Sequence, residues 1–475
     1  MPIATIISKS QGLHALARRF FAEKGMLHAM LSGVATVAVL TLVAKGMSFV
    51  KDAAVAHRFG TSDLLDAFLL SFSLLSFLAA VVGGGLPEAF LPAYAELRHR
   101  RGMQRAQRLA VQACLWNLIV LSSIALVIYV GAPWIIEFTG RGFSVAKRDL
   151  AIGALRSLIP FLIFYGLTFH LSSWLRADKK FVLAASAPLL PPAVIFITLL
   201  LAGQGASVRT LVIGTNVGVC VQLIVLLIAL SRQMGRTPKR CFKVWEPSNR
   251  AVLGNAIPYF MGGLIMNSAV IVDQAMAAWL TPGSVSVLTY SDKVCGIVLA
   301  LTATAASEAV FPFFADSVAR REWALVKRHL LQITGTILLF AVPVSLVFIF
   351  FAPQIVGLLF ERGSFTATDT AKVAGVMRFA AMQIPFYIIG ILASRVAVSM
   401  QATRFTLFAS IAALACNVGM NWFLMQRMGV AGIALSTAFV HLLSAVALYI
   451  YIFRRIGQKI KEGQAETLLK KADRH

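Results

Sequence analysis

Charged side chains stand inside long apolar runs of this 475-residue chain, and they are the residues best placed to do chemistry. An ionisable group within a membrane span costs roughly 2.5–3.5 kcal/mol on insertion scales, so each one needs a reason. Three of them, Lys45, Lys51 and Lys293, are lysines that we expect at a similar depth. Three ammonium groups at one level would form a cationic pocket that suits an anionic head group, phosphate above all.

A second interpretation gives the same lysines a purely internal role. Lys45 would neutralise Asp52, which follows seven residues later on the same helical face. Lys293 would neutralise Asp292 or Asp66. The two interpretations are compatible, because internal ion pairs can hold a pocket together until a substrate competes for the lysines.

Other charged residues are candidates for a gate or for ion coupling. Asp52, in KDAAVA, corresponds to Asp273, in VDQAMA, in the other half of the chain. Glu88 and Glu308 stand at the inner ends of equivalent segments, where they would either close a cytoplasmic gate with arginines or cap helix bends. Arg378 lies within the apolar run over 369–400, the tenth of the predicted spans. The substrate-binding candidates are Lys45, Lys51, Asp66 and Lys293, and the gate or coupling candidates are Asp52, Glu88, Asp273, Asp292, Glu308 and Arg378.

Catalytic and metal-binding motifs are missing from the sequence. The five cysteines lack metal-ligand spacing, and neither an HExxH nor a GxSxG motif occurs. We therefore expect a transporter without cofactor or metal, and not an enzyme; a membrane glycosyltransferase would need an acidic catalytic loop. The membrane potential or a monovalent cation could drive transport, because moving one charge across 100 mV is worth about 2.3 kcal/mol.

The elements that must position these residues are membrane helices. The chain is 58% hydrophobic and 13% charged, with a mean hydropathy of +0.79. Apolar runs of about 20 residues or more predict an all-α polytopic protein with about twelve spans. The net charge of +24 comes largely from short loops on alternate sides of successive spans, which indicates the positive-inside pattern and no nucleic-acid partner. Both termini are therefore expected in the cytoplasm.

The chain is internally duplicated. Residues 88–101 (EAFLPAYAELRHRR) recur as residues 308–321 (EAVFPFFADSVARR), and an AlaPro pair followed by an ArgGly loop occurs in each half. An even number of spans between the repeats predicts two lobes of six helices, related by a pseudo-two-fold axis along the membrane normal. The predicted divisions are an amphipathic cytoplasmic segment 1–30, an N-lobe 31–231, a basic linker 232–250, a C-lobe 251–453 and a basic tail 454–475.

Four motifs together resemble the MurJ/MviN family of lipid II flippases, within the multidrug/oligosaccharidyl-lipid/polysaccharide exporter superfamily. They are KDAAVAHRFGTSDLLDAF from Lys51, EAFLPAYAE from Glu88, GSVSVLTYSDKV from Gly283 and LFERGSFTATDT from Leu359. The resemblance implies two six-helix lobes around a central cavity. It also matches the family's basic cavity residues to Lys45, Lys51 and Lys293, and its DAF aspartate to Asp66.

The resemblance further implies a substrate, a cellular location and partners. The substrate would be an undecaprenyl-pyrophosphate-linked glycan, turned from the inner to the outer leaflet of the bacterial inner membrane by alternating access. The partners would be membrane lipids and enzymes of cell-envelope synthesis. The alternatives are a Wzx-type flippase for O-antigen or exopolysaccharide, a multidrug exporter of the same superfamily, and a transport-dead scaffold.

Three departures from the family pattern stand out. The family has arginine at the three lysine positions, and lysine lacks the planar fork of arginine. The family's charged LRRxFAEG-like run is LAAVVGGG here, at residues 78–85. The family has two more helices after the twelfth, where this chain has a basic tail.

Overall fold

The computed structural model describes residues 36–234 and 248–472, and every regular element in these two ranges is a helix. The apolar runs form the helices, and short polar side chains begin several of them. Ser62 and Ser144 accept backbone N–H groups at the starts of α2 and α4, and Thr366 and Asp369 form a capping box at α13. The elements are a helix over 36–59, α2 (Asp63–Arg101), α3 (Met103–Thr139), α4 (Val145–Ser157), α5 (Ile159–Ala177), α6 (Phe181–Ser186), η1 (Ala187–Leu189), α7 (Leu190–Ala202), η2 (Gly203–Gly205), α8 (Val208–Met234), α9 (Ser248–Ala278), α10 (Ser284–Ala319), α11 (Trp323–Phe350), α12 (Ala352–Phe360), α13 (Ala367–Ala381), α14 (Gln383–Ser399), α15 (Thr403–Met428) and α16 (Val430–Ala472).

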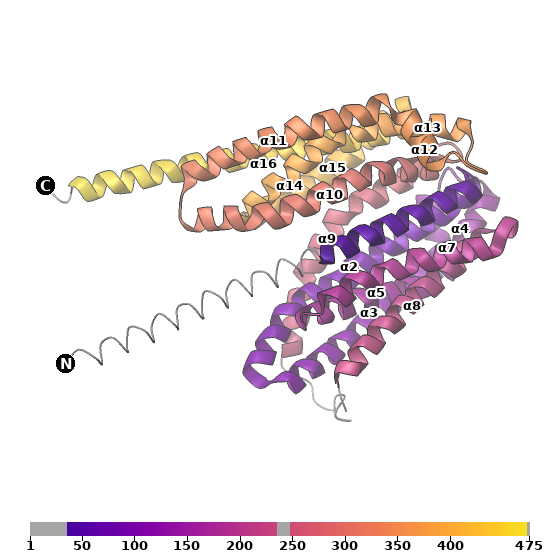
Figure 1. The fold of residues 1–475 in the computed structure, drawn as a ribbon, viewed down its shortest axis with the longest axis horizontal. Coiled ribbons are helices and arrows are strands. Elements are labelled where there is room, and N and C mark those ends of the chain that lie inside the picture. The colour runs from indigo at the N-terminus through magenta and orange to yellow at the C-terminus, as the bar shows by residue number, and fades with distance from the viewer. Residues whose placement is uncertain (1–35, 235–247, 473–475) are drawn as a thin grey trace, which may run out of the picture.

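The helices form two bundles, which Figure 1 shows one above the other. The N-bundle holds the helix over 36–59 and α2–α8, and the C-bundle holds α10–α16. Helix α9 lies between them and packs mainly against α2. In the C-bundle, α10, α14 and α16 pack together, and α16 projects beyond its neighbours at the end opposite α12 and α13 (Figure 1).

The run of three glycines in α2 allows this helix to approach two neighbours closely. A methyl group on Gly83 would lie 2.6 Å from Cα of Gly166 in α5, and one on Gly85 would lie 3.2 Å from the backbone nitrogen of Phe260 in α9. Helix α2 continues through the glycines without a break. The glycines therefore allow α5 and α9 to pack closely against two sides of α2, and they do not mark a bend.

The membrane character of the fold is confirmed. Nine helices of the described residues are long and apolar enough to cross a bilayer, and the pair α4–α5, bent by 44°, makes a tenth. The helix over 36–59 and α10 overlap the two further spans predicted over 31–57 and 285–317. The predicted number of twelve spans is thus not confirmed exactly.

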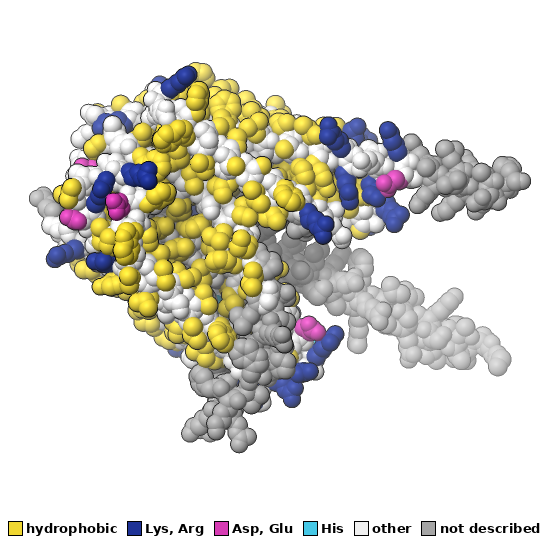
Figure 2. Space-filling view, turned by 180° about the vertical axis from the view of Figure 1, so that it is seen from behind, with side chains coloured by type: hydrophobic (Ala, Val, Ile, Leu, Met, Phe, Trp, Pro, Cys, Tyr) yellow, Lys and Arg dark blue, Asp and Glu magenta, His cyan; other side chains and the backbone are white. Residues whose placement is uncertain are grey.

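The outer surface of the helices suits lipid. Large apolar side chains such as Val127, Leu201 and Phe350 are 68%, 82% and 70% exposed, and Figure 2 shows apolar side chains over most of one face. The same view shows two arms with Lys and Arg gathered near their tips, separated by a hollow. Such a surface fits a protein that spans a membrane with its basic loops at the interface.

Some predicted segments fall wholly or partly outside the described ranges. The amphipathic segment 1–30 and most of the linker 232–250 lie outside them. The predicted tail 454–475 is a continuation of α16 as far as Ala472.

Candidate functional site

Two of the three predicted lysines meet at one carboxylate between the bundles. The Nζ atoms of Lys51 and Lys293 each lie 2.6 Å from Oδ1 of Asp52. Lys51 and Asp52 come from the helix over 36–59, and Lys293 comes from α10 in the other bundle. We call these three residues the lysine–aspartate triad. It carries one net positive charge when all three groups are ionised.

The triad is partly exposed, mainly through its two lysines. The Asp52 side chain is 7% exposed, whereas Lys51 and Lys293 are 18% and 30% exposed. The two lysines are thus more exposed than the carboxylate that they share. Such a site can exchange an internal ion pair for an incoming anion.

The ion pairs that the second interpretation assigned to Lys45 and Lys293 are wrong. Lys45 lies two helical turns, about 10 Å, from Asp52 along the axis, is exposed, and has no ion-pair partner among the residues that the structure describes. Lys293 pairs with Asp52 and contacts neither Asp292 nor Asp66 in an ion pair. The reason is the placement of α10, which brings Lys293 to Asp52 and leaves the neighbouring Asp292 exposed.

Asp66 lies apart from the triad and joins the two bundles. Its carboxylate accepts hydrogen bonds from the backbone N–H groups of Gly283 and Ser286 at the start of α10, both at 2.8 Å. Nζ of Lys147, at the start of α4, donates to Asp66 at 2.9 Å and to Asp63 at 2.5 Å. Asp66 is 1% exposed, so its carboxylate is a buried cap for the first turn of α10.

Lys147 is a residue that sequence reasoning missed as part of a site. It stands in the first turn of α4, close in sequence to Arg141 and Arg148, yet it is only 5% exposed. The sequence did contain a signal for such a residue. Asp63 and Asp66 are three residues apart at the start of a helix, and two carboxylates that lie this close together need a neighbouring cation.

The ArgGly loops of the two halves make equivalent contacts across the bundles. We call residues 140–144 and 361–366 the RG loops. A methyl group on Gly142 would lie 2.6 Å from the carbonyl oxygen of Ala278, at the end of α9. A methyl group on Gly363 would lie 2.5 Å from the carbonyl oxygen of His57, at the end of the helix over 36–59. Each RG loop thus lies against the turn that follows the first helix of the opposite half.

Hydrogen bonds hold both RG-loop contacts. The Ser364 N–H donates to the His57 carbonyl at 2.8 Å, and Thr61 donates to Asp369 of α13. On the other side, Nε1 of Trp279 donates to the Phe138 carbonyl at 3.3 Å. Together with the Asp66 cap, these contacts join the bundles at one end, which we call the closed end.

Asp273 anchors a second buried polar cluster, inside the second half of the chain. Nδ2 of Asn417 and Nδ2 of Asn421 donate to Oδ1 of Asp273 at 3.2 and 2.6 Å, and the Thr437 hydroxyl donates to Oδ2 at 3.2 Å. Asn417 and Asn421 are almost fully buried. The cluster therefore gathers a carboxylate, two side-chain amides and a hydroxyl from α9, α15 and α16.

The asparagines and Thr437 were not predicted from the sequence. Asn417 and Asn421 are four residues apart, so they share a face of α15 in an otherwise apolar span. That spacing was the available signal. Oδ1 of Asn421 is buried without a hydrogen-bond partner among the described residues.

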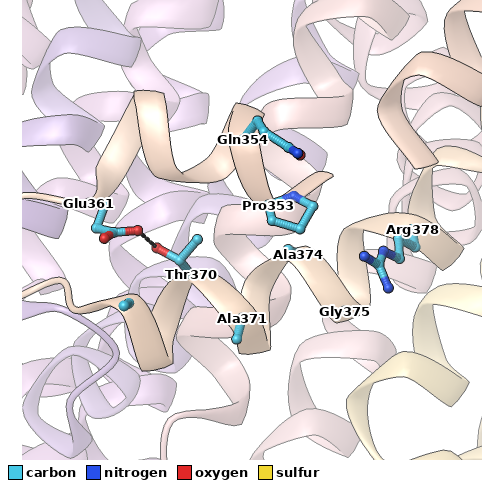
Figure 3. A pocket seen from close by; sticks show the side chains of 9 residues that line it. Pro353, Gln354, Glu361, Thr370, Ala371, Ala374, Gly375 and Arg378 are labelled. Carbon is cyan, nitrogen blue, oxygen red and sulfur yellow. Dashed lines mark hydrogen bonds between the residues drawn. The ribbon is translucent and has the colours of Figure 1, made fainter. Parts of the chain in front are cut away.

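The remaining candidates are separate from the triad. The side chains of Glu88 and Glu308 lie outside what the structure describes, so their predicted gate stays a prediction. Arg378 lines a pocket between α12 and α13 of the C-bundle, together with Gln354, Glu361 and Thr370 (Figure 3).

Comparison with known proteins identifies the relatives of this fold. A model of the family described as "Lipid II flippase MurJ" matches residues 55–472. The lipid II flippase MurJ of Burkholderia cenocepacia is 28% identical over 358 residues, which cover 71% of this chain and 67% of the relative. A probable lipid II flippase MurJ of Rickettsia prowazekii is 22% identical over 436 residues, covering 90% and 84%.

Solved structures share the architecture. A lipid II flippase MurJ in an inward closed conformation is 21% identical, with a TM-score of 0.75 and coverage of 88% of this chain and 89% of that one. An inward-facing multidrug resistance MATE family transporter is 16% identical, with a TM-score of 0.77 and coverage of 89% and 99%. Both kinds of transporter share this fold, so the fold alone does not distinguish them. The family model does, and this chain belongs to the lipid II flippase MurJ family.

Proposed function

We propose that this protein translocates lipid II, a polyprenyl-pyrophosphate-linked glycan, from the inner to the outer leaflet of the bacterial cytoplasmic membrane. The observation that carries the proposal is the lysine–aspartate triad, in which Lys51 and Lys293 from opposite bundles share the Asp52 carboxylate. Family membership supports the substrate, because the matching relatives carry the name lipid II flippase.

The triad suits a pyrophosphate for an electrostatic reason. Two ammonium groups compensated by one carboxylate leave a net positive charge that an anion can neutralise. The exposed fractions of the lysines provide access, while Asp52 holds them in place without substrate. Lys45, exposed on the same helix, adds a further cation for the sugar-phosphate end of the substrate.

Alternating access would follow from the closed end. In the proposed orientation both termini are cytoplasmic, so the RG loops and the Asp66 cap face the outside of the cell. The bundles then separate toward the cytoplasm, where Figure 2 shows the hollow between the two arms. Substrate would enter from the inner leaflet, bind the triad, and leave when the closed end opens.

The Asp273 cluster is the proposed site of ion coupling. Carboxylate, amide and hydroxyl oxygens are the donors that hard cations prefer, and Asp273, Asn417, Asn421 and Thr437 provide such oxygens. The amide groups would turn their oxygens inward to hold a monovalent cation. The unpartnered oxygen of Asn421 supports this assignment.

Complementation of cells depleted of their own lipid II flippase tests the proposal. Wild-type protein should restore growth and outer-leaflet lipid II, whereas Lys51→Ala and Lys293→Ala should fail at equal membrane levels. Lys459→Ala is the matched control, because Lys459 lies on α16 far from the triad and, among the described residues, forms an ion pair only with Glu462. Growth restored equally by all four proteins would reject the lysine pocket, and no rescue by wild type would reject lipid II as the substrate.

A further inference from the structure

A second site with polar side chains is a pocket between α12 and α13. It is lined by these two helices and the loop that connects them, and we call it the α12–α13 pocket. It measures about 500 Å3, and its polar side chains are Gln354, Glu361, Thr370 and Arg378. Figure 3 shows Glu361 and Thr370 at one end and Arg378 at the other, with Ala371, Ala374 and Gly375 between them. All of these residues belong to the second half of the chain, so the pocket is distinct from the triad between the bundles.

Arg378 is a charged residue without a protein partner among the described residues. It lies on α13, which forms a span together with α14, and it is exposed. The structure gives it no hydrogen bond or ion pair with any residue of the described ranges. An arginine on a membrane span is costly unless it meets an anion, water or the lipid head groups.

The internal repeat offers a direct comparison. Arg156 follows Ser144, the cap of α4, by the same number of residues as Arg378 follows Thr366, the cap of α13. Nε of Arg156 donates to the Tyr129 carbonyl at 3.2 Å, and its guanidinium lies 5.3 Å from the centre of the Tyr129 ring. The N-bundle arginine is thus satisfied by the protein, whereas its C-bundle counterpart faces a pocket.

The helix that precedes each arginine also differs between the two halves. Helix α3 continues through Pro133 as far as Thr139. The equivalent stretch of the C-bundle breaks at Phe351, so α11 ends and the short helix α12 begins with the matching AlaPro pair. The pocket lies between α12 and α13, next to this break. Both arginines are exposed, but Arg156 has the Tyr129 carbonyl and ring as partners, whereas Arg378 lines the pocket without a partner among the described residues.

We propose that the α12–α13 pocket binds the phosphate group of a membrane lipid, which the Arg378 guanidinium holds and Gln354 contacts. Arginine binds phosphate through two parallel N–H groups, so an exposed arginine on a membrane span can hold the phosphate of a lipid head group. Glu361, which accepts from the Thr370 hydroxyl at 2.7 Å, places negative charge at the far end and so directs the phosphate to Arg378. The small side chains between the ends leave room for the glycerol or prenyl segment of the lipid.

Two membrane lipids carry this chemistry, an anionic phospholipid and a polyprenyl phosphate. Full-length protein would be reconstituted in phosphatidylcholine nanodiscs containing a small fraction of phosphatidylglycerol or of undecaprenyl phosphate. Native mass spectrometry would count the anionic lipid retained by wild type, Arg378→Gln and the control Arg156→Gln. We expect wild type and Arg156→Gln to be enriched in one of the two lipids, and Arg378→Gln to retain at least about fivefold less.

The outcomes are distinct. Enrichment of phosphatidylglycerol identifies a phospholipid site, and enrichment of undecaprenyl phosphate identifies a site for the carrier lipid. Equal retention by wild type and Arg378→Gln would overturn the proposal, as would an equal loss in Arg156→Gln. Because Arg378 is exposed, its substitution leaves the core intact, and the midpoint of thermal unfolding of each variant checks this.

Discussion

Nζ of Lys293 lies 2.6 Å from Oδ1 of Asp52, although 241 residues separate them in the sequence. The contact joins the first helix of one half to the second helix of the other. Lys51, the neighbour of Asp52, reaches the same oxygen. An anion that draws the lysines away from Asp52 would therefore change the contact between the bundles, which links substrate binding to their relative movement.

Removing the shared carboxylate should leave two ammonium groups in mutual repulsion. We expect Asp52→Asn to lower the free energy of unfolding by about 1.5–3 kcal/mol, the range for a hydrogen bond to a charged group. Thermal unfolding in detergent measures the change. The double variant Asp52→Asn/Lys293→Gln should be more stable than Asp52→Asn alone, because one uncompensated cation is removed. Additive losses in the double variant would show that Lys293 and Asp52 are not coupled.

Loss of the Asp66 cap should lower the free energy of unfolding more than loss of the Asp52 carboxylate, because the partners of Asp66 are buried. Asp66→Ala would leave Lys147, 5% exposed, without its buried partner and would free two N–H groups of α10. Breaking a buried pair costs about 3–5 kcal/mol. Thermal unfolding should show this loss, and the double variant Asp66→Ala/Lys147→Met should recover part of it. No recovery would mean that the cap, and not the ion pair, accounts for the stability.

A methyl group in an RG loop should open the closed end. Gly142→Ala would place a carbon 2.6 Å from the Ala278 carbonyl, which requires the loop to withdraw. Spin labels on the exposed residues 149 and 372, one in each bundle, would report the separation by pulsed electron resonance. We expect Gly142→Ala to shift the distribution to longer distances. Gly153→Ala, whose methyl group meets no atom within 4 Å, should not; identical distributions for both variants would refute the role of the loop.

A monovalent cation at the Asp273 cluster should stabilise the protein. Because a ligand that binds only the folded state raises stability in proportion to its occupancy, we expect one of NaCl, KCl and LiCl to raise the midpoint of thermal unfolding above the others. Asp273→Asn should abolish this difference. Asp149→Asn, which removes an exposed carboxylate, is the control. A wild type that responds equally to all three salts would exclude a specific site.

The apolar runs were sufficient to predict the helices, because a membrane span needs a length of apolar sequence and little else. They also predicted that Lys51 and Lys293 lie at a similar depth. The partners of these lysines could not be predicted, because Lys293 reaches Asp52 through the packing of α10 and not through helix spacing. Lys147 and Asn421 were missed for a similar reason: each contributes to a site made by three elements that only the folded chain brings together.

The most direct test of the lysine–aspartate triad is the rate of lipid II translocation in liposomes that contain the purified protein. Lipid II with a reporter on its head group would be followed from one leaflet to the other. We predict that Lys51→Ala/Lys293→Ala reduces the rate at least about tenfold relative to wild type, since each lost charge-assisted contact to phosphate is worth about 1.5–3 kcal/mol. The control Lys459→Ala should translocate lipid II normally. Translocation by the double variant at the wild-type rate, with equal amounts of folded protein, would contradict the account.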